Sequence, residues 1–209
     1  MFYDPQLFDF TQEFERNWQK IRAEYLQLDP RLLDFHRNAP YETYIEKLSQ
    51  DNGWMNSWQV NSDRPKNDWT VYALSYQGIF PAEAPAKFPF IASLLSRLSG
   101  FRVCVFSNLK ALAHIAPHSH PEMEDDLLIY HLGIDVVPGK SYLWVDRQFE
   151  EQRNGKSIIF DGGCEHFAIN MSDSDRVVLY LEFDRHQVRL KPSRSQKSEV
   201  RSQRILNTE

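Results

Sequence analysis

Cysteine is scarce in this sequence, in which Cys104 and Cys164 are the only two among 209 residues. They lie far apart in the chain, in apolar or turn-rich surroundings, so they neither suggest a disulfide framework nor supply the spacing of a zinc knuckle. We therefore expect two reduced thiols, with Cys104 packed in the core.

Long apolar runs are also missing. No window approaches the roughly 18 consecutive apolar residues that a membrane-spanning helix needs. The opening Met1-Phe2-Tyr3-Asp4-Pro5 has no basic segment followed by an apolar one, which a secretory leader would have. The sequence therefore predicts a cytoplasmic protein with no membrane partner.

Glycine and proline are infrequent, at eight and eleven residues, which argues against a chain that is disordered throughout. The rest of the composition is ordinary for a globular protein, with 42% hydrophobic, 13% aromatic and 25% charged residues. A chain of this length can bury one sizeable core, so we expect one domain rather than two.

The net charge of -5 conceals an asymmetry between the body and the C-terminal end. Residues 185–209 hold seven Lys or Arg against two Glu, which leaves the preceding part of the chain acidic. A basic tail can contact nucleic acid or an acidic surface, but such tails are more often solvated and poorly ordered. We expect a flexible tail over residues 185–209 and no nucleic-acid partner.

Two segments have helical periodicity. In residues 11–28 the apolar positions fall at three- and four-residue intervals on one face, and Thr11 is placed to cap the helix. In residues 88–98 the same spacing follows Pro89, a residue that suits the first turn of a helix.

From Thr70 onwards short β-rich runs dominate, separated by turn pairs such as Pro138-Gly139 and Asn154-Gly155. The predicted strands are 70–76, 101–106, 108–116, 127–137, 141–146, 156–161, 164–169 and 176–183. Many short strands separated by hairpin turns indicate a mainly β fold. We predict a double-stranded β-helix, or jelly roll, with the N-terminal helices packed outside. The single domain then covers residues 1–184, with a helical and loop part at 1–69 and the β-core at 70–184.

Histidine is unevenly distributed. His114, His118, His120 and His131 fall close together, and His166 follows in a later strand-like segment. Side chains two apart in an extended segment point to the same side, so His118 and His120 can face one cavity. Imidazole suits iron, zinc, copper or nickel, and the spacing alone leaves the metal undecided. His114 is the one we assign to packing or to the surface.

Four blocks of the sequence resemble the aspartyl/asparaginyl β-hydroxylase family in order and spacing. They are Ala116-Pro117-His118-Ser119-His120-Pro121, Tyr130-His131-Leu132-Gly133, Ile159-Phe160-Asp161-Gly162-Gly163-Cys164-Glu165-His166, and Arg176 ten residues later. The resemblance is good over residues 70–184. It implies a jelly-roll dioxygenase that uses iron(II), 2-oxoglutarate and O2 to hydroxylate a small molecule or a peptide side chain.

The resemblance also implies roles for single residues. His118 and His166 match the two protein ligands of iron(II), and the family lacks the ligating carboxylate of the common facial triad. Arg176 matches the arginine that pairs with the distal carboxylate of 2-oxoglutarate, and Ser107 falls where the family places a hydroxyl against the same cosubstrate. His131 matches a histidine near the cosubstrate's other end.

The chain departs from the family pattern in two places. His120 stands where animal members carry glycine, so it can be a third ligand or can hydrogen-bond a bound water. We favour a role beside the metal, in contact with water or substrate, because a third ligand leaves fewer open positions. The acidic run 122–126 replaces arginines that receive an acidic substrate in the animal enzymes, so it favours a basic or zwitterionic substrate, or is simply a solvated charge run.

Other roles follow from position. Glu165 and Asp161 are candidates to orient His166 through its second ring nitrogen. Tyr130, Tyr142 and Trp144 are candidates to line the cavity, although large aromatics in strands are more often core.

Two other functions stay open on the sequence alone. A cupin-type metalloenzyme would use His118, His120 and His166 together without 2-oxoglutarate, and Arg176 then has no defined role. A non-catalytic β-sandwich binding protein would bind no metal at all.

Overall fold

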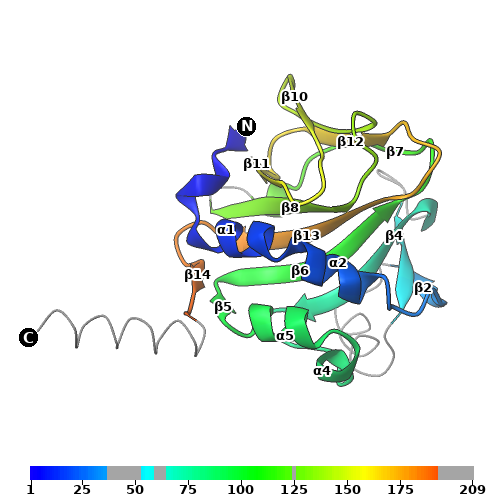
Figure 1. The fold of residues 1–209 in the computed structure, drawn as a ribbon. Helices are drawn as coiled ribbons and strands as arrows, with labels where there is room; N and C mark the ends of the chain where they lie inside the picture. Colours follow the sequence, from blue (N-terminus) through cyan, green and yellow to red (C-terminus); the bar gives the residue numbers. More distant parts are fainter. Residues whose placement is uncertain (37–52, 59–64, 124–125, 193–209) are drawn as a thin grey trace, which may run out of the picture.

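The computed structural model describes residues 1–36, 53–58, 65–123 and 126–192 (Figure 1). None of the helices in these ranges has the length and apolar character that crossing a bilayer requires. Both cysteines are free thiols, and Cys104 is fully buried, as the sequence indicates.

Most of the described chain folds into two layers of strands, which pair antiparallel except for one parallel pair at the edge of the larger sheet. The larger sheet has eight strands in the order β1-β11-β8-β13-β6-β4-β3-β2, and the smaller has four in the order β10-β9-β12-β7. The bounds of the larger sheet are β1 Phe2–Tyr3, β11 Ser157–Asp161, β8 Leu127–Asp135, β13 Arg176–Asp184, β6 Phe101–Leu109, β4 Pro65–Tyr76, β3 Trp54–Trp58 and β2 Leu32–His36. Those of the smaller are β10 Gln148–Glu151, β9 Ser141–Val145, β12 His166–Asn170 and β7 His114–His118.

Side-chain alternation along β13 shows how the layers are built. Val177, Leu179, Leu181 and Phe183 point into a core shared with the helices. Residues on the other face, such as Tyr180, belong to a second core shared with the smaller sheet. Because side chains two apart in a strand share a face, one sheet serves both cores. This is the predicted double-stranded β-helix.

Short helices cover the outer face of the larger sheet (Figure 1). They are α1 Asp9–Arg16, α2 Trp18–Tyr25, α4 Ala84–Lys87 and α5 Pro89–Leu95. Phe10, Phe14 and Ile21 contribute fully buried side chains to the core beneath, which confirms that the N-terminal helices lie outside the β-core.

The predicted single helix at 11–28 is wrong in detail. The segment forms two helices that meet at Asn17, whose side-chain amide donates to the Glu13 carbonyl instead of continuing the apolar face. Thr11 lies inside α1 rather than at its cap, and its hydroxyl donates to the carbonyls of Pro5 and Phe8. The tertiary contact with the preceding turn overrides the local capping preference.

Two predicted strand boundaries are also wrong. The runs 101–106 and 108–116 predict a break near Ser107, but β6 is continuous to Leu109 because it pairs on both sides, with β13 and β4. The break comes later, at a turn in which Leu112 has a positive φ of 54°. Strand β10 was not expected at all, because most of its side chains are exposed and it pairs only with β9.

The described chain continues beyond the expected domain boundary at residue 184. Val188 is 5% exposed in the helix-side core, and β14 (Arg189–Leu190) pairs with β5 (Leu98–Ser99). The remainder of the expected tail, residues 193–209, lies outside the described residues, so its flexibility stays a prediction.

Candidate metal centre and cosubstrate cavity

His118 and His166 are cross-strand partners in the β7–β12 ladder. The pairing depends on an irregularity, because two residues lie between Ile115 and His118 on β7 where only one lies between His166 and Ala168 on β12. A bulge of this kind turns the following side chain to the other face. Pro117 lies within it, and β7 is an edge strand, where a residue without an N–H is tolerated.

Backbone carbonyls fix the tautomers of both histidines. His118 Nδ1 lies 2.9 Å from the Ala116 carbonyl oxygen, and His166 Nδ1 lies 2.8 Å from that of Cys164. A carbonyl only accepts, so both Nδ1 atoms carry the hydrogen and both Nε2 atoms present a lone pair. The carboxylates of Glu165 and Asp161, expected to orient His166, are not its hydrogen-bond partners.

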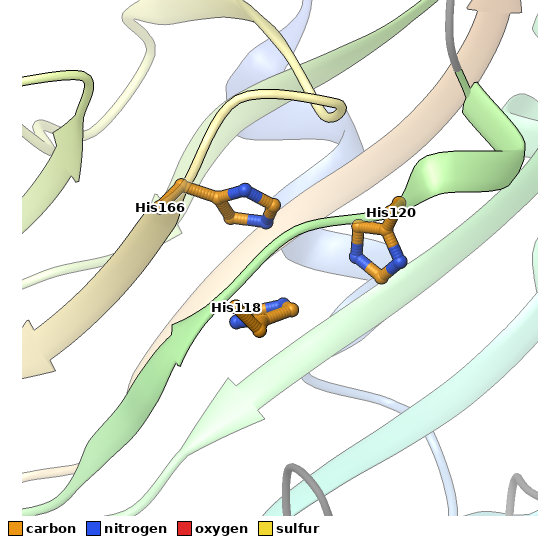
Figure 2. A group of neighbouring side chains, drawn as sticks. All are labelled: His118, His120 and His166. Atoms are coloured by element: carbon orange, nitrogen blue, oxygen red, sulfur yellow. The ribbon is translucent and has the colours of Figure 1, made fainter.

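His120 joins this pair to form a cluster of three (Figure 2). One ring nitrogen from each of His118, His120 and His166 lies within 4.8 Å of the other two. His166 is 4% exposed, and burial, followed by the charge on His118, lowers its pKa to about 3. The imidazole is therefore neutral at pH 7, which is the form that binds metals.

Arg176 is the largest fully buried side chain and carries a charge into the interior. It opens β13, its Nη1 donates to the Ser107 carbonyl at 3.4 Å, and among the described residues its Nε and Nη2 have no hydrogen-bond partner. Burial lowers its pKa to about 10, so it remains protonated at pH 7. A buried cation with two unused donors is a site for a carboxylate.

Ser107 lies on the same face as this guanidinium, on the neighbouring strand. Its Oγ accepts a hydrogen bond of 3.0 Å from the indole nitrogen of Trp69. The Ser107 hydroxyl therefore keeps its own hydrogen to donate to an anion beside Arg176.

His131, on strand β8, is also buried. Burial, then the charges of Arg176 and His166, hold the pKa of His131 well below its ordinary value. Gln152 Nε2 lies 3.1 Å from His131 Nδ1, and with Nδ1 as the acceptor the ring hydrogen is on Nε2. His131 is then a neutral donor.

One cavity brings together the six residues that the sequence analysis placed at the metal or the cosubstrate. Ser107, His118, His120, His131, His166 and Arg176 all line it. The other described residues lining it are Trp69, Ile115, Leu143, Phe160, Ala168 and Tyr180. None of these is acidic, so the described wall of the cavity offers a cation, imidazoles and a hydroxyl to an anionic ligand.

The sequence profile of the aspartyl/asparaginyl β-hydroxylase family matches residues 15–186. The chain belongs to this family. It is also 27% identical over 184 residues to an ornithine lipid ester-linked acyl 2-hydroxylase of Rhizobium tropici, across 87% of this chain and 59% of that protein. The chain thus spans less than two thirds of that relative's length.

Two of the solved structures similar to this hydroxylase-family chain are distant from it in sequence. A 2OG-Fe(II) oxygenase family oxidoreductase from Burkholderia pseudomallei shares 12% identity with a TM-score of 0.43, over 74% of this chain and 96% of that one. The cupin domain of Schizosaccharomyces pombe Cnp3 shares 9% identity with a TM-score of 0.38, over 57% of this chain and 66% of that one.

The aromatic lining of this hydroxylase-family cavity differs from the expected one. Tyr130, Tyr142 and Trp144 do not line the cavity. Tyr130 belongs to the helix-side core, and Trp144 stacks on Phe167 with ring centroids 5.2 Å apart. Trp69, Phe160 and Tyr180 do. Strand alternation could have identified Tyr180, because it lies four residues after Arg176 on the same face of β13.

Two further predictions concern residues at the edge of the site. His114 is exposed on β7, in agreement with a surface role. The acidic run 122–126 lies partly outside the described residues. Within the described part, the Asp126 carboxylate lies 3.1 Å from His186 Nε2 and 3.5 Å from Arg185 Nη2.

Proposed function

We propose that this hydroxylase-family chain is an iron(II)- and 2-oxoglutarate-dependent dioxygenase, with His118 and His166 as metal ligands. The observation that carries the proposal is the buried, charged Arg176, whose Nε and Nη2 lack partners among the described residues and which lines the same cavity as the two histidines. A dicarboxylate that reaches both features accounts for them together.

Each residue of the site has its own role in this proposal. His118 and His166 present their Nε2 lone pairs, held by the carbonyls of Ala116 and Cys164. Arg176 and Ser107 bind the carboxylate distant from the metal, which sets the orientation of the cosubstrate.

The remaining lining residues support this arrangement. His131 donates from Nε2 near the other end of the cosubstrate, while Phe160, Leu143 and Ile115 exclude water. Bound iron(II), with O2 and 2-oxoglutarate, supplies the oxidising chemistry that hydroxylates a C–H bond.

The proposed substrate is an amino-acid-like small molecule or a peptide side chain. The relative from Rhizobium tropici is named for hydroxylation of an ester-linked acyl chain of ornithine lipid, which adds a lipid-linked acyl group as a second substrate class. We propose a cytoplasmic location for the enzyme. The substrate classes are separated by measuring succinate formed from 2-oxoglutarate in the presence of free amino acids, short peptides or ornithine-lipid micelles.

The first experiment is an anaerobic titration of the metal-free protein with iron(II) and then 2-oxoglutarate. Chelation of ferrous iron by the keto acid should give a weak visible charge-transfer absorption, which His166→Ala should lose. Arg176→Met should need a higher concentration of 2-oxoglutarate to develop the same absorption. A parent protein that binds iron(II) but never develops the band would favour the cupin-type enzyme instead. A parent that binds no metal would favour the binding protein.

A further inference from the structure

His120 is held towards the metal pair by its own backbone. Its N–H donates to the Gly162 carbonyl at 2.9 Å, in the turn that leads to His166, and its carbonyl accepts from the Met123 N–H at 2.9 Å. Met123 is itself buried at 1% exposure and packs against Gly162, where an added Cβ would lie 3.0 Å from its sulfur. The position of His120 is therefore fixed from both sides.

The ring of His120 faces the other two (Figure 2). Its centroid lies 5.0 Å from that of His118 and 5.3 Å from that of His166. Three nitrogens that share one face of an ion at about 2.1 Å lie about 3.0 Å from one another. The three ligand atoms here lie within 4.8 Å of one another, so side-chain rotations that close at most about 1.8 Å bring them to that spacing.

We propose that His120 is a third protein ligand, so that the metal is held by three imidazoles. This inference rests on the proposed function only for the presence of a metal. His120 would occupy the place that a carboxylate fills in the common facial triad, which distinguishes this chain from the two-histidine pattern of the family. It also reverses our sequence-based preference for a role beside the metal.

The number of coordination positions permits this arrangement. A six-coordinate metal with three protein ligands keeps three positions, and a bidentate cosubstrate plus dioxygen fill three. The facial triad of non-haem oxygenases works with the same number. The objection that a third ligand leaves too few positions therefore does not hold.

A site of three imidazoles would be more positive than the common facial triad, which includes a carboxylate. Three neutral imidazoles leave the full double positive charge on the metal, where a carboxylate would cancel part of it. Arg176 adds another positive charge to a cavity in which no described lining residue is acidic. The set is suited to an anionic cosubstrate more than to a neutral one.

The test is titration of the metal-free protein with Co²⁺ alone, in parent, His120→Gln, His120→Asp and His114→Gln. Glutamine keeps hydrogen-bonding capacity but is a poor ligand, so His120→Gln should weaken Co²⁺ affinity by about 100-fold or more, beyond the loss typical of residues outside the ligand set. His120→Asp should recover most of it. His114→Gln changes an exposed histidine on β7 and should match the parent.

A second readout counts the ligands directly. Pulsed EPR of the Cu²⁺-loaded protein should detect three imidazoles in the parent and two in His120→Gln. Thermal unfolding without metal should agree between these two proteins, which shows that the variant is folded. Unchanged affinity and an unchanged imidazole count in His120→Gln would overturn this inference and leave the proposed function standing. A parent that binds no Co²⁺ would overturn both.

Discussion

His118 and His166 face each other across the β7–β12 ladder, with ring centroids 4.3 Å apart. Their Nδ1 atoms are already engaged by backbone carbonyls, so the Nε2 atoms are oriented before any metal arrives. The two side chains should therefore move little when the metal binds, and the whole binding free energy should add to the free energy of unfolding.

The first prediction concerns metal-linked stability. A divalent metal at about 100 times its dissociation constant should raise the free energy of unfolding by about 2.7 kcal/mol. His166→Ala should abolish this rise, since one of the two opposed ligands is lost, whereas His114→Ala should retain it. Differential scanning fluorimetry with and without Co²⁺ measures the difference. A shift of equal size in His166→Ala would place the metal elsewhere.

Arg176→Met should separate cosubstrate binding from stability. The variant loses charge-assisted hydrogen bonds to a carboxylate, together about 3 kcal/mol, so the dissociation constant for 2-oxoglutarate should rise about 100-fold. Without ligands the variant should be at least as stable as the parent, because a buried guanidinium with two unused donors is replaced by an apolar side chain of similar length. Calorimetry and urea unfolding give the two quantities. Unchanged 2-oxoglutarate affinity would contradict the assignment.

Ser107→Ala should have a smaller effect on the same affinity. One hydroxyl donor to a carboxylate contributes about 1.5 kcal/mol, or roughly a tenfold change. The indole N–H of Trp69 also loses its acceptor, so the variant should be less stable than the parent by about 1 kcal/mol. Ser107→Thr keeps the hydroxyl and is the control. A threonine variant as weak as the alanine variant would mean that packing, not the hydroxyl, is responsible.

Acid should destabilise the metal-free protein through His131. Its pKa in the folded chain lies well below the ordinary 6.5, first because of burial and then because of Arg176 and His166. Below pH 6.5 the unfolded chain takes up this proton and the folded chain does not, so the free energy of unfolding falls as the pH drops. Above that pH, where both states are neutral, His131 has no effect.

The size of this pH dependence is measurable. Each such group contributes up to about 1.4 kcal/mol per pH unit, and His166, with a pKa of about 3, acts in the same direction. Urea unfolding of His131→Gln between about pH 7.5 and 5 should show a shallower decline than that of the parent. Identical slopes would show that His131 is protonated in the folded chain.

Glu24 should be a stabilising residue far from the cavity. Glu24 is 9% exposed, and its carboxylate accepts hydrogen bonds from the backbone N–H groups of Phe90 and Ile91 at 2.6 and 2.9 Å, at the start of α5. Glu24→Ala should lower the free energy of unfolding by about 2 kcal/mol, since two hydrogen bonds to a charged group are lost. Glu83→Ala, which removes an exposed ion pair with Lys87, should change it by about 0.5 kcal/mol or less. Equal effects would show that Glu24 has no capping role.

Much of the fold was predictable because the segments that form β13 and β8 are short β-rich runs bounded by turn residues. Ser107, His131 and Arg176 were singled out by the resemblance to the family, and the structure places them around one cavity. Their roles stay predictions. What failed were features set by distant contacts: the extension of β6 through Ser107 depends on its pairing with both β13 and β4.

Other parts of the site could not be predicted from the identities of the side chains. The groups that orient His118 and His166 are main-chain carbonyls, which every residue possesses and which no sequence pattern marks. Trp69 was overlooked because a tryptophan at the edge of a predicted strand is most often core, whereas in the structure it lines the cavity and donates a hydrogen bond to Ser107.

The bulge at Pro117 allows two side chains that are three positions apart in β7 to face the same cavity. Ile115 and His118 are three positions apart, so in a regular strand they would point to opposite sides, yet both line the cavity. Deleting one of the two intervening residues would remove the bulge and leave Ile115 and His118 two positions apart, a spacing that keeps both side chains on one face of a regular strand. A related chain that is one residue shorter in this stretch should therefore still present both side chains to the cavity, on a straighter edge strand.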